Sequence, residues 1–263
     1  MVPPAIPTVL SIHALYTGNR RGLVADVLAG IEQGLDVQTV CTAHVVASHD
    51  RVTDSTDVPA DTVSSQLEHL FAATTPRAAK VGILGDRRTV DVVFDALDDL
   101  NGPIVLDFTA SGPSGETVLT QRGIDALSER MSRADLVMLR RADAELVTGG
   151  EIRSLDDAQV AAQRATNRGA QRVLIKCGAL PVRFYEAADD PEANSTGFHS
   201  DLYYDGDEFA LFEAPMLDIG HLRGASGVHS MALLRVLVAG ASMEEGLQIA
   251  KREVTDWLRK SLG

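Results

Sequence analysis

Short runs of branched apolar residues alternate with longer segments of helical periodicity along nearly the whole chain. The first unit pairs an apolar run at residues 8–12 with a helical pattern at 22–34, and at least six such units follow one another along the sequence. The other expected strands lie at residues 37–42, 80–85, 104–107, 136–139 and 173–176, and the other expected helices at 63–73, 90–100, 123–131 and 158–168. Uninterrupted apolar strands that alternate with helices are typical of a mostly parallel sheet covered by helices on both faces. We therefore predict an α/β fold of three layers, formed by a single domain over residues 1–263.

The alternation breaks once, between residues 186 and 212. This stretch begins acidic and irregular, and then gives apolar runs at 202–204 and 209–212 on either side of an Asp-Gly pair. An Asp-Gly pair between two such runs favours a tight hairpin. We expect an antiparallel hairpin at the edge of the sheet, and whether residues 186–207 form a lid stays open. A last helix is expected at residues 243–262.

The composition restricts the partners and the cellular setting. A formal net charge of −13 argues against nucleic acid or an anionic membrane as a partner, because both would repel the protein surface. Two cysteines without metal-ligand spacing, an N-terminus without signal-peptide features and the lack of a long apolar run favour a cytoplasmic protein. With 45% hydrophobic residues the chain can bury a full core. We expect a small-molecule ligand.

The Gly-Ala-Ser-Gly segment at residues 224–227 precedes an apolar run at 231–239. Small residues let successive backbone N–H groups converge on an oxyanion, and the N-terminus of the following helix adds positive potential. The segment therefore predicts a phosphate-binding cradle. A kinase also needs a side chain that takes the proton from the attacking hydroxyl, and neither Gly227 nor Val228 supplies one. His229 is the nearest titratable residue, although a partly exposed helix histidine is its simpler interpretation.

Charged residues stand at the ends of three expected strands, where ligands of such sheets bind. Asp107 closes one strand and either binds Mg²⁺ or caps a loop. Lys176 ends another, and it either neutralises a phosphate or forms an ion pair. Arg140 and Arg141 follow a third strand. Adjacent side chains cannot both point inward, so at most one of these arginines binds a phosphate, and a surface salt bridge is the alternative.

Several short segments occur in an order and at a spacing that resemble one enzyme family. They are Val40-Cys41-Thr42-Ala43, Lys80-Val81-Gly82-Ile83-Leu84-Gly85, Ile104-Val105-Leu106-Asp107, Ala134-Asp135-Leu136-Val137, Glu145-Leu146-Val147-Thr148-Gly149 and Gly169-Ala170-Gln171-Arg172-Val173-Leu174-Ile175-Lys176. With the cradle, they resemble the hydroxymethylpyrimidine phosphate kinases and pyridoxal kinases of the ribokinase superfamily over nearly the whole chain. The resemblance implies a ribokinase-like fold, a site for ATP and Mg²⁺ over the carboxyl ends of the strands, and a small alcohol-bearing ring as phosphoryl acceptor. Homodimers are common in these families, so a homodimer is also expected.

The strand-end residues and the resemblance together assign the site. Nucleotide and phosphate binding fall on Lys176, Arg140, Gly224, Ala225, Ser226 and Gly227, metal binding on Asp107 and Asp143, and the substrate pocket on His13, Tyr16, His44 and Ala47. The family's Pro-Asn-x-x-Glu motif, which serves the metal and the phosphates, becomes Leu139 to Asp143 with Arg140 in place of the amide. Its catalytic Cys or Asp falls on Gly227, and its pyrimidine-contacting glutamine falls on Ala47.

Three functions follow as alternatives. The first is a phosphomethylpyrimidine kinase-like protein that binds ATP and a small hydroxymethyl ring compound, with conventional phosphoryl transfer in question because Gly227 cannot act as a base. The second is a catalytically impaired relative that binds a ligand or a partner protein. The third is an active kinase for a different small alcohol, with Asp107, Asp143 or His229 recruited as the base.

Overall fold

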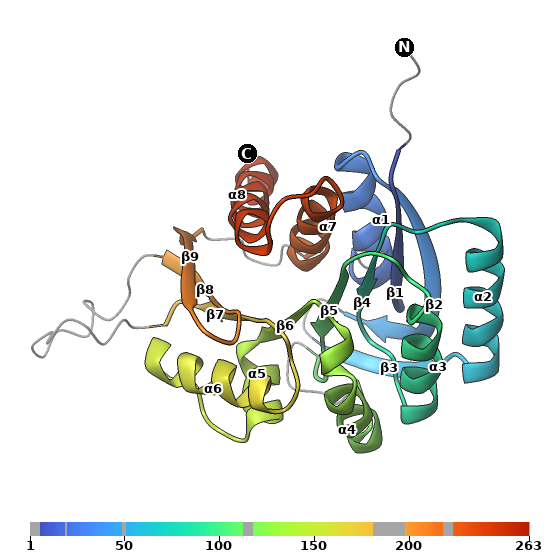
Figure 1. The fold of residues 1–263 in the computed structure, drawn as a ribbon, viewed down its shortest axis with the longest axis horizontal. Helices are drawn as coiled ribbons and strands as arrows, with labels where there is room; N and C mark the ends of the chain where they lie inside the picture. Colours follow the sequence, from blue (N-terminus) through green and yellow to red (C-terminus); the bar gives the residue numbers. More distant parts are fainter. Residues whose placement is uncertain are drawn as a thin grey trace, which may run out of the picture.

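A single twisted sheet runs through the computed structural model, which describes residues 6–18, 20–48, 51–112, 118–180, 198–217 and 223–262. Its nine described strands have the order β3-β2-β1-β4-β5-β6-β7-β8-β9 (Figure 1). The strands are β1 (Thr8–Thr17), β2 (Asp36–Ala47), β3 (Val52–Asp57), β4 (Ala78–Val81), β5 (Ile104–Phe108), β6 (Leu136–Arg140), β7 (Val173–Gly178), β8 (Phe198–Tyr204) and β9 (Phe209–Pro215). The six strands from β2 across to β7 are parallel, whereas β3 at one edge, and β8 with β9 at the other, pair antiparallel to their neighbours. The predicted mostly parallel sheet with an antiparallel edge hairpin is confirmed.

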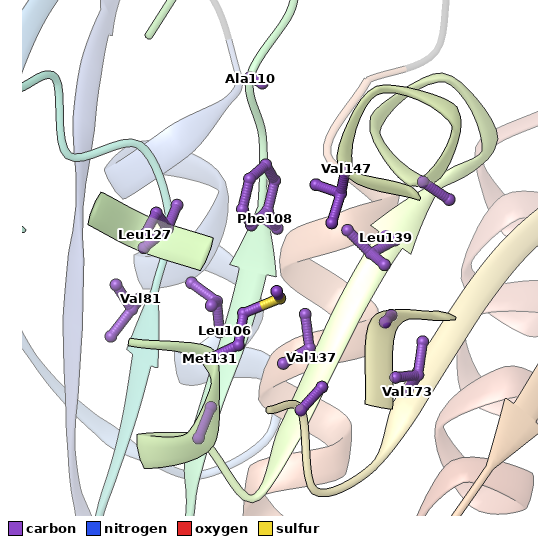
Figure 2. Packing of buried hydrophobic residues seen from close by; sticks show 14 of the residues in the cluster. Val81, Leu106, Phe108, Ala110, Leu127, Met131, Val137, Leu139, Val147 and Val173 are labelled. Atoms are coloured by element: carbon purple, nitrogen blue, oxygen red, sulfur yellow. The ribbon is translucent and has the colours of Figure 1, made fainter. Parts of the chain in front are cut away.

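Helices cover both faces of the sheet, with α1, α7 and α8 on one face and α2 to α6 on the other (Figure 1). Their bounds are α1 (Gly22–Glu32), α2 (Ala60–Ala73), α3 (Arg87–Leu97), α4 (Gln121–Glu129), α5 (Arg141–Thr148), α6 (Leu155–Asn167), α7 (Ala225–Val238) and α8 (Met243–Leu262), with a 3-10 turn at Met131–Arg133. Strand residues alternate between the faces. Leu106 and Val137 pack with Leu127 and Met131 in the cluster on one face (Figure 2), whereas Val105 and Met138 pack in the cluster that includes residues of α7 and α8. Burial on both faces is why the strands are continuous apolar runs, and it confirms the three layers.

Two elements are not predicted by the sequence. β3 is almost wholly exposed and polar, so it lacks the apolar pattern of the inner strands. α5 begins at the residue that follows β6 and ends at Thr148, because the next residue, Gly149, has a φ of 71° that stops the helix. The strand expected at 80–85 already ends at Val81.

Of the segment considered as a lid, residues 186–197 lie outside the described part of the chain, and 198–204 form β8. None of the described helices is long and apolar enough to cross a bilayer.

Candidate functional site

The predicted strand-end residues meet at one edge of the sheet. Asp107 lies near the end of β5, Arg140 ends β6, and Lys176 in β7 pairs in register with Arg140. Ser226, in the first turn of α7, joins them: its Oγ donates a hydrogen bond to Asp107 Oδ2 at 2.5 Å and accepts one from Lys176 Nζ at 3.1 Å. Gly224 caps α7 with a φ of 107°, in the left-handed region that favours glycine. The N-terminus of a long helix is therefore fixed over the ends of β5 and β7.

A chain of opposite charges runs from α1 to β7 beneath this cradle. Lys80 in β4 is 1% exposed, and its Nζ lies 2.6 Å from Asp26 Oδ1 and 3.5 Å from Asp107 Oδ2. Ser11 Oγ donates a 2.6 Å hydrogen bond to Asp26 Oδ2, and Lys176 Nζ lies 3.7 Å from Asp107 Oδ1. Burial alone would lower the pKa of Lys80, but the two carboxylates outweigh it and raise that pKa. Burial alone would raise the pKa of Asp107, but Lys176 and Lys80 hold it well below its usual range, so Asp107 is ionised and a weak base.

Two cavities open beside the N-terminus of α7. The β1-side cavity has a volume of about 400 Å³ and is lined by His13 and Tyr16 among others. The α8-side cavity has a volume of about 260 Å³ and includes His229 in its wall. Arg140 and Ser226 line both of them. The two cavities therefore meet at the phosphate cradle predicted by the sequence.

Most of the predicted site residues line one of these cavities. Those of the β1-side cavity are His13, Tyr16, Asp107, Arg140, Gly224, Ser226 and Gly227, and those of the α8-side cavity are Arg140, Lys176, Ala225, Ser226 and His229. His44, Ala47 and Asp143 line neither cavity. His44 is exposed on β2, Ala47 packs against a small apolar cluster that contains Tyr16, and Asp143 is fully buried.

The wall of the β1-side cavity carries a neutral histidine and a tyrosine. The N–H of Ala14 donates a 2.7 Å hydrogen bond to His13 Nδ1. Burial, and then the charge of Lys80, lowers the pKa of His13 to about 4, so the ring is neutral at pH 7. A Cβ on Gly82 would lie 2.2 Å from His13 Cδ2, so glycine is required where the ring lies on the backbone. Tyr16 meets His13 edge-on, with ring centroids 6.4 Å apart.

Position 227 lies against α1. Gly227 is buried, and a Cβ added there would lie 3.0 Å from the carbonyl carbon of Ala25 and 3.0 Å from Asp26 Oδ1. A Cβ at this position would therefore be tightly packed, and α1 would have to give by a few tenths of an ångström to accept it. At the place where the resemblance puts the catalytic base, the chain has no proton-accepting side chain.

His229 is buried within α7, and the expectation of a partly exposed helix histidine is wrong. It is 4% exposed, and its Nδ1 has no hydrogen-bond partner among the described residues. Burial, with Lys176 and Lys251 nearby, lowers the pKa of His229 well below its ordinary value, so the imidazole is neutral. Buried polar atoms are rarely left without a partner. His229 therefore contributes a neutral imidazole to the lining of the α8-side cavity, with its buried Nδ1 unpaired among the described residues.

Comparison with known proteins gives the family. Residues 18–263 match the family model for phosphomethylpyrimidine kinase. The chain belongs to the phosphomethylpyrimidine kinase family. The hydroxymethylpyrimidine/phosphomethylpyrimidine kinase of Aquifex aeolicus is 28% identical over 254 residues, which cover 96% of this chain and 94% of that protein.

Solved structures of kinases share the fold of this family member. Pyridoxal kinase from Staphylococcus aureus in complex with AMP-PCP has a TM-score of 0.80 and 26% identity, with 95% of this chain and 87% of that chain covered. Phosphomethylpyrimidine kinase from Clostridium difficile has a TM-score of 0.76 and 20% identity, with 98% and 100% covered. The ribokinase-like fold expected from the resemblance is confirmed.

The carboxylates assigned to magnesium in this phosphomethylpyrimidine kinase relative are both engaged by the protein itself. Asp143 accepts the N–H of Ala110 at 3.1 Å on Oδ1 and Arg140 Nε at 2.6 Å on Oδ2. Asp107 is paired with two lysines, as described above. Within the described ranges, no group of three or more His, Cys, Asp or Glu side chains could hold a metal ion. Because both carboxylates are already paired with cationic side chains, neither fits the role of a free carboxylate ligand for Mg²⁺.

Two pairs of charged residues belong to the site although the sequence does not predict them. Lys80 stands alone in an apolar strand, and the chain has few lysines, namely Lys80, Lys176, Lys251 and Lys260. A rare charged residue in an apolar strand is a feature of the sequence that could have identified Lys80 as a site residue. Its partner Asp26 is 54 residues away and gives no signal. Lys251 Nζ pairs with Asp201 Oδ2 at 2.9 Å, and both residues line the α8-side cavity.

Proposed function

We propose that the protein binds a nucleotide in the α8-side cavity and a small hydroxymethyl ring compound in the β1-side cavity, in the manner of a phosphomethylpyrimidine kinase. The observation that carries this proposal is that Arg140, at the end of β6, and Ser226, at the start of α7, line both cavities. A phosphate donor in one cavity and an alcohol in the other would meet at the same backbone cradle. Positioning of this kind is a large part of phosphoryl-transfer catalysis.

The α8-side cavity suits ATP. Pro215, Leu217 and Leu258 contribute apolar wall against which a base can pack. Lys176 lies at the cradle, where its Nζ already binds Ser226, so phosphate groups there would contact a cation. Pyridoxal kinase from Staphylococcus aureus has been solved with ADP and with AMP-PCP, which supports a nucleotide in this relative as well.

The β1-side cavity suits a small polar ring. The neutral imidazole of His13 and the phenol of Tyr16 offer hydrogen-bonding edges to a heterocycle. Arg21 and Arg223 also line this cavity, and guanidinium groups favour an acceptor that carries a phosphate ester. The relatives named as hydroxymethylpyrimidine/phosphomethylpyrimidine kinases support this class of acceptor.

Phosphoryl transfer should be slow, because no base stands at Gly227. Of the three groups considered as substitutes, only Asp107 lines the β1-side cavity, since His229 lines the other cavity and Asp143 lines neither. Asp107 is a weak base because neighbouring lysines hold its pKa low. A positioned general base contributes roughly 10²–10⁴-fold to rate. The protein is therefore a slow kinase whose binding functions are retained.

Calorimetric titration with ATP, followed by an ADP-release assay with hydroxymethylpyrimidine, its phosphate and pyridoxal, tests the proposal. We expect ATP to bind and ADP release to be at least about 100-fold slower than with the Clostridium difficile kinase. Lys176→Ala should weaken ATP binding, whereas Lys260→Ala, at an exposed position of α8, should not. Absence of ATP binding would refute the nucleotide site, and release at the rate of the Clostridium difficile kinase would refute slow transfer.

A further inference from the structure

Arg140 holds a guanidinium charge at the junction of the two cavities. Its Nε donates to Asp143 Oδ2 at 2.6 Å, and its Nη2 donates to the carbonyl oxygen of Ser111 at 2.6 Å. The Arg140 side chain is nevertheless 39% exposed and lines both cavities. A positive charge therefore lies where the phosphates of a nucleotide in the α8-side cavity would meet an acceptor in the β1-side cavity.

Both carboxylate oxygens of Asp143 are already hydrogen bonded. Oδ1 accepts from the N–H of Ala110 at 3.1 Å and from Ser111 Oγ at 3.3 Å, while Oδ2 accepts from Arg140, and the side chain is fully buried. Mg²⁺ takes oxygen ligands in a near-octahedral shell and keeps several waters. To reach Asp143, the ion would have to displace Arg140 and open a buried site.

Asp107 is engaged in the same way. Its Oδ2 accepts from Ser226 and lies 3.5 Å from Lys80 Nζ, and its Oδ1 lies 3.7 Å from Lys176 Nζ. Each of these two acidic groups thus has a cationic partner from the protein. Among the residues that the structure describes, the junction offers cations to phosphate oxygens and no unneutralised carboxylate to a metal ion.

We propose that this protein binds its nucleotide without a divalent cation, with Arg140 and Lys176 in contact with the phosphates in place of magnesium. The inference rests on the proposed nucleotide binding. Arginine suits the role, since its planar guanidinium is always charged and binds phosphate oxygens in pairs. Free ATP should then bind with an affinity close to that of the Mg-ATP complex.

Titration calorimetry of the wild-type protein with ATP, in EDTA and in magnesium chloride at equal ionic strength, tests this inference. We expect the Kd in EDTA to be no more than roughly fivefold above the Kd in magnesium, and a larger ratio would overturn the inference, because it would mean that metal and nucleotide binding are coupled. Absence of ATP binding in both buffers would overturn the proposed function and this inference with it. The two failures are therefore distinguishable.

Arg140→Gln has a matched control in Arg141→Gln, because Arg141 is adjacent, exposed and lines neither cavity. Arg140→Gln should weaken ATP binding in EDTA by roughly tenfold or more, while Arg141→Gln should leave it unchanged. Arg140→Gln alone leaves the buried Asp143 without its cation, so the double variant with Asp143→Asn keeps the pair neutral, and circular dichroism checks its fold. Unchanged affinity of the folded double variant in EDTA would overturn the role of Arg140.

Discussion

Replacement of Gly227 by Ala, Asn and Asp separates steric from electrostatic effects at the position to which the resemblance assigns the catalytic base. A Cβ there would lie 3.0 Å from the carbonyl carbon of Ala25 and 3.0 Å from Asp26 Oδ1. Contacts this short force α1 or α7 to shift, and overpacking of this kind costs about 1–3 kcal/mol. Helix propensity opposes the clash, because Ala is favoured over Gly by about 1 kcal/mol in a helix. We expect Gly227→Ala to lower the free energy of unfolding by about 0–2 kcal/mol.

In Gly227→Asp, charge repulsion lowers the free energy of unfolding by more than the steric effect of Gly227→Ala does. The new carboxylate would lie roughly 4 Å from that of Asp26, and two like charges at this distance repel by about 4 kcal/mol at an effective dielectric constant of 20. Lys80 Nζ, 2.6 Å from Asp26 Oδ1, offsets part of the repulsion. The helix N-terminus favours an acidic side chain by about 0.3–1 kcal/mol. Repulsion is the largest of these effects, so Gly227→Asp should be less stable than Gly227→Asn by about 1–3 kcal/mol.

Urea unfolding of the wild type and the three variants at pH 7 measures these differences, with ADP release followed in parallel. A Gly227→Ala variant more stable than the wild type by about 1 kcal/mol would refute the close packing, because propensity alone would then explain the change. Equal stability of the Asn and Asp variants would refute the electrostatic part. Full kinase activity of a stable Gly227→Asp variant would refute the expectation that a side chain here strains the packing of α1.

Two further changes test the buried charges. Lys80→Met should lower the free energy of unfolding by about 3–5 kcal/mol, because it leaves Asp26 buried without its cation. Urea unfolding of the double variant with Asp26→Leu should recover most of that loss, and no recovery would contradict the pairing. His13 has a pKa of about 4 in the folded protein against 6.5 ordinarily, so the unfolded chain binds the proton more readily. Its contribution to stability is fully present above pH 6.5 and is lost as the pH falls toward 4, so the melting temperature of His13→Gln should depend less on pH in that window. Equal pH dependence of the two proteins would argue against a neutral buried His13.

The inner strands can be predicted from the sequence because helices cover both of their faces. All five residues of β5 are buried, so an unbroken apolar run that ends in Asp107 and Phe108 is enough to identify it. β3 carries no such run, since five of its six residues are exposed, and its position depends on antiparallel pairing with β2. That pairing is a long-range property, which no local pattern contains.

The candidate site is likewise predictable only in part: the sequence indicates its strand-end residues but not their long-range partners. Because parallel strands end at one edge of a sheet, their terminal residues Asp107, Arg140 and Lys176 can be brought together without a structure. The partners of these residues cannot be predicted in this way, and the salt bridge from Arg140 to Asp143 is an example. Alternation of side chains along β2 also leaves His44 exposed between buried neighbours, outside the pocket to which the resemblance assigns it.

The close packing of α1 against Gly227 bears on how this lineage can evolve. A single nucleotide change turns a glycine codon of the form GGT or GGC into one for aspartate or cysteine. In a protein with open space beside this position, that change alone would introduce a titratable side chain without strain. Here a Cβ at residue 227 would lie 3.0 Å from the carbonyl carbon of Ala25 and 3.0 Å from Asp26 Oδ1, so α1 has to give before a larger side chain is accommodated. The contact couples every substitution at this position to the packing of α1.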